Sequence, residues 1–381
     1  MESNKLVKKR IIITRSNPVC PDSRVEKEAL TLMDEGYDVT ILCWDRDSNH
    51  KIEKSFLNLS NKKIPILRIG YKATFGEGIK NLFQYLKFQF SMRHWIKKNH
   101  YDFDILHACD FDTAFFTYRL AKRMKKKVVF DIFDFLYCEP IGIVQKIIKK
   151  CQLRIINNAD LTIICTEERK KQIEGSKPKN LIVVHNSPST KQLPNNIIFK
   201  KRNTEKIRIC YVGILQDGRL LKEIGHYFSA HPEYEFHVGG FGYLSDYFKK
   251  LSDDNSNIHF YGRIPYEKTL ELEFNCDVML AIYDPKIQNH RYAAPNKFYE
   301  SLFLGKPVVM VRGTGMSSTV EENNIGELID YSEEGFSLGV DKLVLKKQHW
   351  ARISKKMKEL YESDYSWEIM KIRLLNAYKN L

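Results

Sequence analysis

The residues whose types and spacing are best suited to chemistry lie in the stretch "RYAAPNKFYESLFLGKPVV", from 291 to 309. Pro295 suits the first turn of a helix, where its missing N–H is not needed and the free amides point outward as an anion site. Lys297 and Glu300 are three residues apart, so they share one face of that helix. Gly305 is predicted to end the helix. The stretch therefore predicts a place where a phosphate and a sugar hydroxyl are held together, although a Lys–Glu pair also suits an ordinary surface helix.

Short apolar segments alternate with predicted helices in both halves of the chain, and these elements must position the residues near 300. The predicted strands are 10–14, 37–44, 64–70, 103–109, 127–133, 159–166, 180–187, 207–213, 234–240, 257–262, 276–283 and 307–311. The predicted helices are 22–35, 79–98, 112–124, 141–157, 219–229, 243–251, 265–275 and 295–304, with further helices to the C-terminus. Between the halves, the polar segment 187–204 contains Pro188 and Pro194 and is predicted to be a linker. This pattern predicts two α/β domains on parallel sheets, whose ligands bind at the carboxyl ends of the strands.

The composition is that of a globular protein of two domains, with 381 residues of which 43% are hydrophobic. No run of about 18 apolar residues occurs, so no membrane-spanning helix is predicted. No signal peptide is expected either, because charges lie close to a short N-terminal apolar run that no small-residue cleavage site follows. The 8 cysteines are scattered without a CxxC pattern, which favours reduced cytosolic thiols over a zinc site.

The formal net charge of +14 requires an explanation. No helix-turn-helix, RNA-recognition or zinc-finger pattern is visible, so nucleic acid is not the expected partner. The segments 79–99 and 141–157 combine lysines and arginines with apolar residues and contain no acid, which is typical of helices that rest on an anionic membrane surface. An ordinary core helix with a solvated lysine face fits these segments equally well.

Seven segments in order give the chain a family resemblance. They are "NPVCPDSRVEKEALTLMDEGYDVTIL", "DILHACDFDTAFFTYRLAKRMKKKVVFDIFDF", "ADLTIICTEE" with "VVHNSP", "YVGILQDGRLLKEI", "HVGGFG", "FYGRIPYEKTLELEFNCDVMLAIY" and "APNKFYESLFLGKPVV" with "ENNIGELID". In this order they resemble family-four retaining glycosyltransferases of the two-Rossmann-domain type, called GT-B, over nearly the whole chain. The resemblance implies two Rossmann-like α/β domains facing across a cleft, with a C-terminal helix crossing back to the first. The expected boundaries are 1–186 plus 366–381 for the acceptor-side domain, 187–204 for the linker and 205–365 for the donor-binding domain.

The resemblance implies that the second domain binds a nucleotide-diphosphate sugar. The family's second conserved glutamate falls on Glu300, whose carboxylate would accept both ribose hydroxyls. Amides around Asn296 and Lys297 would hold the diphosphate, with the lysine as a point charge against the leaving group. The remaining donor-side candidates follow strand ends, where tight turns or solvent-facing charges are the alternative. They are Gly213, Arg219, Lys222, Gly240 and Arg263.

The sequence departs from the family's pattern at three positions. Tyr292 stands where the family's first glutamate is usual, so His290 or Arg291 would contact the donor instead. Ile214 replaces the arginine after the first C-terminal glycine, which leaves the diphosphate charge to Arg219 and Lys222. Phe133 replaces a histidine on the acceptor side. The acceptor-side candidates that remain are His107, Asp110, Asp131 and Asp134, and each could equally be a buried polar group at a strand end.

The expected reaction needs no enzymic nucleophile, because the leaving phosphate itself can take the acceptor proton during a same-face attack. The catalytic set would then be Glu300, Lys297, Arg219 and Asp134, which position the reactants and stabilise the departing diphosphate. No cofactor and no metal are expected, since no acid pair of DxD type follows a strand where the diphosphate would bind. The predicted protein is a cytoplasmic retaining hexosyltransferase, peripheral on the inner face of the cell membrane, that acts on a glycan or lipid-linked glycan. A non-catalytic nucleotide-sugar-binding subunit and an epimerase of the same fold are the alternatives.

Overall fold

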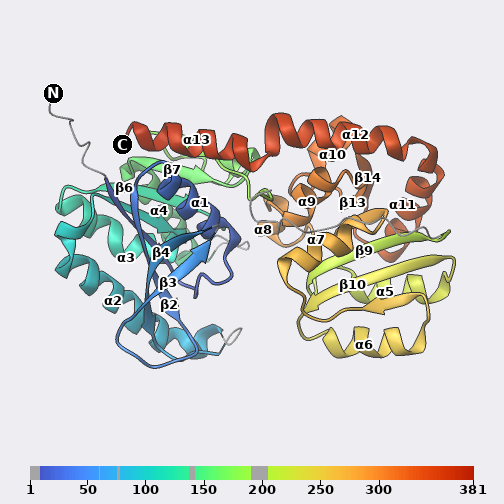
Figure 1. Ribbon diagram of the computed structural model, residues 1–381, viewed down its shortest axis with the longest axis horizontal. Coiled ribbons are helices and arrows are strands. Elements are labelled where there is room, and N and C mark those ends of the chain that lie inside the picture. Colours follow the sequence, from blue (N-terminus) through green and yellow to red (C-terminus); the bar gives the residue numbers. More distant parts are fainter. Residues whose placement is uncertain (1–8, 60, 75–77, 137–141, 190–204) are drawn as a thin grey trace. The chain divides into compact units, whose positions relative to one another are not determined.

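The computed structural model describes residues 9–59, 61–74, 78–136, 142–189 and 205–381, shown as coloured ribbon in Figure 1. The chain divides into two compact units. The N-terminal unit comprises Met1–His185 together with Met370–Leu381, and the C-terminal unit comprises Asn186–Ile369. Most of the predicted linker, residues 190–204, lies outside the described residues.

The N-terminal unit is built on an eight-stranded sheet in the order β3-β4-β2-β1-β5-β6-β7-β8. Its strands are β1 (Arg10–Arg15), β2 (Asp38–Asp45), β3 (Glu53–Leu59), β4 (Lys62–Gly70), β5 (Ile105–Cys109), β6 (Lys127–Ile132), β7 (Leu161–Ile164) and β8 (Leu181–Val183). Its helices are α1 (Ser23–Asp34), α2 (Leu82–Lys98), α3 (Asp110–Arg123) and α4 (Ile143–Asn158). All pairings are parallel except that of the edge strand β3 with β4. Strand β3 was not predicted, because "EKSFLNL" is mostly polar and its side chains are largely exposed.

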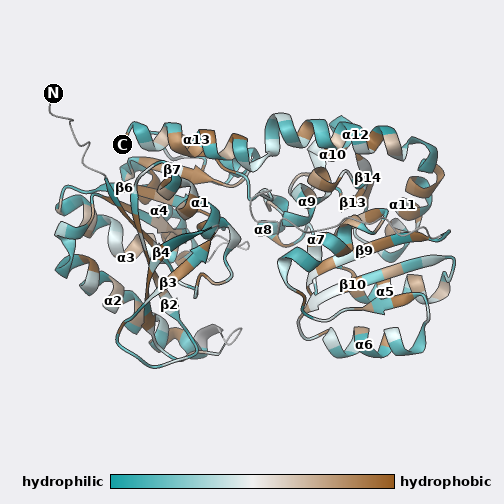
Figure 2. Cartoon of the chain, viewed as in Figure 1, coloured by the Kyte–Doolittle hydropathy of each residue, from teal (hydrophilic) through white to brown (hydrophobic). Residues whose placement is uncertain are grey.

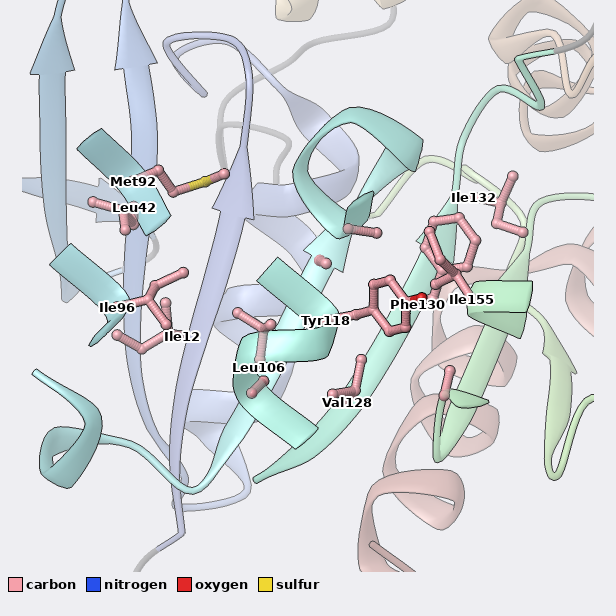
Figure 3. Close-up of a cluster of buried hydrophobic side chains, with 14 of the residues drawn as sticks. Ile12, Leu42, Met92, Ile96, Leu106, Tyr118, Val128, Phe130, Ile132 and Ile155 are labelled. Carbon is pink, nitrogen blue, oxygen red and sulfur yellow. The ribbon is translucent and has the colours of Figure 1, made fainter. Parts of the chain in front are cut away.

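The core of the N-terminal unit lies between this sheet and its helices. Figure 3 shows Ile12, Leu42 and Leu106 from the strands beside Met92 and Ile96 of α2. These side chains are almost fully buried, and burial of each large apolar side chain stabilises the fold by roughly 1.5–3 kcal/mol. A continuous apolar layer therefore packs against the strands that carry the N-terminal site candidates and holds these strands in position.

The last residues of the chain complete the N-terminal unit. Helix α13 (Trp367–Lys379) brings Tyr378 to His107 on β5, where the Tyr378 hydroxyl lies 2.6 Å from His107 Nδ1. Lys379 pairs with Glu35 at the end of α1, at 3.2 Å. The prediction that a C-terminal helix returns to the first domain is confirmed by these contacts.

The C-terminal unit contains a six-stranded parallel sheet in the order β11-β10-β9-β12-β13-β14. Its strands are β9 (Ile207–Ile214), β10 (Tyr234–Phe241), β11 (Ile258–Phe260), β12 (Val278–Ala281), β13 (Val308–Val311) and β14 (Gly326–Ile329). Its helices are α5 (Leu221–Ala230), α6 (Ser245–Asp254), α7 (Tyr266–Phe274), α8 (Gln288–Arg291), α9 (Asn296–Leu304), α10 (Ser317–Asn323), α11 (Glu333–Leu345) and α12 (Trp350–Leu360). The short elements β14 and α8 were not predicted, since each spans too few residues to show a period. In Figure 2, the surface helix α6 is coloured mostly hydrophilic, as expected of a helix that packs on the sheet by one face.

Two predicted helix boundaries can be compared directly with the structure. Asp22 is the N-cap of α1, and its carboxylate accepts a hydrogen bond from the Val25 amide, as predicted. Gly305 ends α9 with a φ of 65°, also as predicted. The placement of Pro295 in the first helical turn is wrong, because Pro295 is the extended N-cap residue and α9 begins at Asn296.

None of the described helices is both long enough and apolar enough to cross a membrane.

Candidate functional site

The candidate site of the C-terminal unit lies where the strand order reverses. Strands β9 and β12 are neighbours in the sheet, and the chain leaves them toward opposite edges. Ligands of open α/β sheets bind in the crevice at such a switch point, outside the carboxyl ends of the strands. Here these ends carry Gly213 on β9 and, just beyond β12, the buried Tyr283.

Two cationic side chains converge on the ring of Tyr283. The guanidinium carbon of Arg219 lies 3.8 Å from the ring centroid, and the Lys297 ammonium lies 6.0 Å from it. Lys297 Nζ also lies 4.6 Å from the centroid of the Tyr211 ring. The aromatic faces hold both cations in position without neutralising them.

Neither cation has a direct anionic partner in the described part of the chain. Arg219 Nε and Nη1 are buried and have no hydrogen-bond partner among the described residues. Lys297 is only 9% exposed, and no salt bridge to it is formed within those residues. Buried polar groups are almost always paired, so two adjacent unpaired cations indicate a site for an anionic ligand.

The charge of Lys297 persists despite its burial. Burial opposes the ammonium, but Tyr283, Tyr211 and Glu300 together raise the pKa of Lys297 above its usual value. Arg219 acts in the opposite direction, because two like charges repel. Lys297 is therefore a permanent positive charge at physiological pH.

Glycines at the ends of β9 and β10 let these strands approach each other closely. Gly213 and Gly240 are register partners, with φ values of 157° and 137°. A Cβ on Gly240 would lie 1.8 Å from the Gly213 carbonyl oxygen, so only glycine fits there. A Cβ on Gly213 would lie 2.6 Å from Lys297 Nζ. Both glycines thus permit the close approach of the two strands, and Gly213 also leaves space for the lysine.

Glu300 lies on α9 one turn after Lys297, and it is 4% exposed. The hydroxyl of Tyr266, at the start of α7, donates a hydrogen bond to its carboxylate. A second carboxyl group, that of Glu273, is buried nearby on α7. Lys297 and Glu300 therefore share a buried helix face, and the alternative of a surface Lys–Glu pair is wrong.

The first turn of α9 offers two amides to a ligand. The amide of Phe298 is already bonded to the Pro295 carbonyl at 2.9 Å, which leaves those of Asn296 and Lys297. Asn296 is exposed, and its side-chain oxygen accepts a hydrogen bond from Asn186 Nδ2 at 2.9 Å. These two amides lie at the N-terminal, positive end of the helix, where an anion is favoured.

The other two predicted donor-side cations are exposed at the surface. Lys222 is exposed on α5, and Arg263 is exposed with its guanidinium 4.7 Å from the Phe241 ring centroid. Arg291 donates to the Pro285 carbonyl at 2.8 Å. His290, in contrast, packs edge-on against Tyr283, with ring centroids 5.3 Å apart. Of the substitutes considered for the missing first glutamate, His290 is therefore the one beside the cations.

The N-terminal unit has its own switch point between β1 and β5, where Arg15 ends β1 and Asp110 directly follows β5. Arg15 forms ion pairs with both Asp110 and Asp22. Asp110 accepts hydrogen bonds from the amides of Phe133 and Asp134, at 2.8 and 3.1 Å. Burial raises the pKa of Asp110 to about 6, against the opposing effect of Arg15.

The other acceptor-side candidates differ in accessibility. Asp134 is exposed and pairs with the buried Arg169 at 3.0 Å. His107 and Asp131 are fully buried, and Asp131 accepts from Arg24 at 2.7 Å. The buried-group alternative therefore describes the environment of His107 and Asp131, whereas Asp110 and Asp134 remain partly open to solvent.

Phe133, at the usual histidine position, has a packing role. The guanidinium carbons of Arg15 and Arg24 lie 4.2 and 4.9 Å from its ring centroid. An aromatic face between two arginines is a favourable cation–π arrangement. Neither arginine was predicted as a site residue, nor were Tyr211, Tyr266, Glu273 and Tyr283, since none belongs to a spacing pattern with a known chemistry.

Three groups of potential metal ligands occur in the described residues. They are His107, Cys109 and Asp131; Glu235, His237 and His259; and Asp45, His50 and Glu53. Arg24 already pairs with Asp131 of the first group, and Arg208 Nε lies 3.1 Å from His237 Nε2 in the second. None of the three includes a residue of the Arg219–Lys297 site, so the metal-independent reaction stays a prediction.

Comparison with known proteins assigns a segment of the N-terminal half to a protein family. Residues 24–191 match the family model described as Glycosyltransferase Family 4. This segment is a glycosyltransferase family 4 domain. The predicted resemblance and the prediction of a glycosyltransferase are confirmed by this match. A search of curated proteins finds no match.

Solved structures support the fold of the whole chain. Sucrose-phosphate synthase from Thermosynechococcus elongatus is similar with a TM-score of 0.72 and 14% identity, over 98% of this chain and 99% of that one. Anabaena HepE in complex with UDP gives a TM-score of 0.70 at 12% identity, over 98% and 100%. The E. coli trehalose-6-phosphate structure bound with UDP-2-fluoro glucose gives 0.72 at 11% identity, over 98% and 99%. The predicted GT-B fold of two Rossmann-like α/β domains is thereby confirmed for this chain.

Proposed function

We propose that the chain is a retaining glycosyltransferase that moves a hexose-type sugar from a nucleotide-diphosphate sugar to a glycan or lipid-linked glycan. The observation that carries this proposal is the pair of unpaired cations, Arg219 and Lys297, on Tyr283 at the switch point of the C-terminal sheet. Three similar structures contain UDP or a UDP-sugar, which supports a nucleotide-sugar donor. The proposed role is in the synthesis of cell-surface polysaccharide or glycoconjugate.

The site residues support a charge-stabilised transfer. The bond between the anomeric carbon and the diphosphate oxygen breaks, the acceptor oxygen bonds to that carbon on the same face, and the leaving phosphate takes the acceptor proton. Lys297 and Arg219 stabilise the negative charge on the leaving diphosphate, together with the amides of Asn296 and Lys297. Glu300, oriented by Tyr266, holds the ribose hydroxyls. Cationic side chains supply this stabilisation without a metal.

On the acceptor side, Asp110 and Asp134 are the carboxylates best placed to accept hydrogen bonds from sugar hydroxyls. Both lie at the carboxyl end of the N-terminal sheet, and Asp134 is exposed. A carboxylate that can accept several hydrogen bonds is the usual means of orienting a polyol. This role for Asp134 is positioning of the acceptor rather than chemistry at the anomeric carbon.

The proposed location is the cytoplasm, at the inner face of the cell membrane. Helix α4 exposes Ile143, Val144 and Ile147, with Ile143 79% exposed, and the same helix carries Lys146 and Lys150. Apolar side chains among lysines suit the boundary between lipid headgroups and acyl chains. A second basic feature lies between α3 and α4, where a hollow is lined by Tyr118, Arg119, Lys122, Arg123, Arg154 and Asn158. Anionic lipid headgroups would neutralise both the lysines of α4 and the cationic side chains that line this hollow.

The proposal is tested by thermal-shift measurements with UDP, GDP, ADP and their common sugar conjugates, on wild type, Glu300→Ala and Glu359→Ala. Glu359 is an exposed glutamate of α12 and serves as the matched control. A ligand at about 100 times its dissociation constant stabilises the native state by roughly 2.7 kcal/mol. We expect one nucleotide to stabilise wild type and Glu359→Ala but not Glu300→Ala.

Absence of a shift with every ligand would contradict a donor site. Binding without sugar transfer or donor hydrolysis would instead favour the non-catalytic nucleotide-sugar-binding subunit.

A further inference from the structure

Glu273 is a buried acid that the proposed mechanism does not use. It lies on α7 and is 1% exposed, and neither of its carboxylate oxygens has a hydrogen-bond partner among the described residues. Helix α7 packs against α9 and β9, which carry the donor-site residues. A buried carboxylate charge without hydrogen bonds is strongly unfavourable, so the state of this group affects everything around it.

The charged and titratable groups facing Glu273 come from every neighbouring element. Glu300 repels its negative charge and Lys297 attracts it, both from α9. Cys276 faces it from the turn before β12, Cys210 from β9, and Tyr266 from its own helix. Burial, and then Glu300, raise the pKa of Glu273 well above its usual value, and the attraction to Lys297 does not reverse this.

The charge balance of the site depends on that proton. With Glu273 neutral, the two positive charges of Lys297 and Arg219 exceed the single negative charge of Glu300, and the net charge of the site is positive. Ionised Glu273 would cancel this balance beside the position of the leaving diphosphate. It would also place a second negative charge next to Glu300, which in the proposed donor site accepts the ribose hydroxyls as a carboxylate.

We infer that Glu273 remains protonated in the working protein and restricts the buried carboxyl pair to one negative charge, on Glu300, so that the site attracts a nucleoside diphosphate. Glu273 is thus a positioning residue that acts through Glu300 and Lys297. The inference rests on the proposed function, because it takes those two residues as the donor-binding pair.

Infrared difference spectroscopy and UDP binding test the inference together. We expect wild type near pH 7 to show the carbonyl stretch of a protonated carboxylic acid that is absent in Glu273→Gln. When the pH is raised until this band is lost, the affinity of wild type for UDP should fall by up to about tenfold per pH unit, because one proton is linked to binding. Glu273→Gln should not show this fall. Lys297 stays charged over the interval, because its pKa is raised.

The matched control is Glu271→Gln, on the same helix, where Glu271 is partly exposed and pairs with Lys268. It should keep both the band and the fall in affinity. If Glu273→Gln does not fold, Glu273→Asp should move the band to the position of an aspartic acid.

Two results would overturn the inference: absence of the band near neutral pH, or an unchanged UDP affinity where the band disappears. Failure of wild type to bind UDP, GDP or ADP near neutral pH would instead overturn the donor site itself, so the two failures are distinguishable.

Discussion

Replacement of Lys297 by methionine separates a ligand-binding role of this lysine from a structural one. The ammonium is buried, lies over Tyr211, and forms no salt bridge within the described residues. Methionine keeps the length and the apolar contacts of the side chain and removes only its charge. If Lys297 contacts the diphosphate, the variant loses a charge-assisted hydrogen bond worth about 1.5–3 kcal/mol. Donor affinity should then fall roughly 10-fold to 150-fold.

The stability of Lys297→Met should change much less than its affinity. The cation–π contacts that are lost are worth about 0.5–2 kcal/mol, and the variant no longer buries a charge, which offsets part of this loss. A net change of about 1 kcal/mol in the free energy of unfolding shifts the melting temperature of a domain of this size by roughly 2–4 °C. A large loss of binding with a small change in melting temperature is therefore expected.

Calorimetric titration of the nucleotide selected by the thermal-shift panel measures the affinity, and the melting temperature of the free protein measures stability. Lys306→Met is the matched control, since Lys306 Nζ also lies over an aromatic ring, 5.0 Å from the centroid of Phe274. Wild-type affinity in Lys297→Met, or an equal loss in Lys306→Met, would refute the argument for a diphosphate contact.

Three further perturbations follow from the described contacts. Gly240→Ala forces a Cβ to within 1.8 Å of the Gly213 carbonyl oxygen, and we expect a loss of at least about 1–3 kcal/mol in urea unfolding; an unchanged midpoint would contradict the close strand approach. Glutamates at both Ile143 and Ile147 should abolish the salt-sensitive sedimentation of the protein with anionic vesicles, whereas retained sedimentation would exclude α4 as the docking face. Burial, and then nearby arginines, lower the pKa of His185 to about 3, so stability should fall as the pH drops from about 6.5 toward 3, by up to about 1.4 kcal/mol per pH unit. His185→Gln should lose less stability than wild type over that interval in urea titrations, and equal losses would contradict the assignment.

The sign of the His185 effect follows from proton linkage. The unfolded chain binds a proton at this histidine near pH 6.5, whereas the folded chain does so only near pH 3. Between these values the unfolded state holds more protons, so acid favours unfolding.

The elements of the fold were predictable wherever their pattern was long or strongly apolar. Strands such as Ile207–Ile214 and the N-cap at Asp22 follow directly from apolar runs and capping chemistry. The edge strand Glu53–Leu59 was missed because its polar residues gain strand structure only by pairing with β4. Pro295 was misplaced by one position, because proline suits both the N-cap and the first helical turn.

The residues proposed to contact the donor could be predicted from the sequence, whereas the residues that hold them in position could not. Lys297, Glu300 and Arg219 have charges and positions that sequence alone can single out. Tyr283 and Tyr266 have ordinary strand and helix surroundings in the sequence, and only the folded chain brings Tyr283 under two cations and Tyr266 to Glu300. Glu273 was missed for a similar reason, since its burial depends on α7 packing against α9.

The two switch points differ in how their cations are compensated, and this difference bears on what each binds. In the N-terminal unit, Arg15 is paired with Asp110 and Asp22, and Arg24 with Asp131. In the C-terminal unit, the guanidinium of Arg219 has no partner for Nε and Nη1 within the described residues.

Where each arginine is paired with a carboxylate, the site has little net charge but still has carboxylate oxygens that accept hydrogen bonds. Such a site suits the hydroxyl groups of a neutral sugar. Uncompensated cations over an aromatic ring attract an anion and gain most from one whose charge grows during the reaction. The unpaired guanidinium of Arg219 therefore supports the proposed diphosphate site on the C-terminal unit, and the paired Arg15 and Arg24 support the proposed acceptor site on the N-terminal unit.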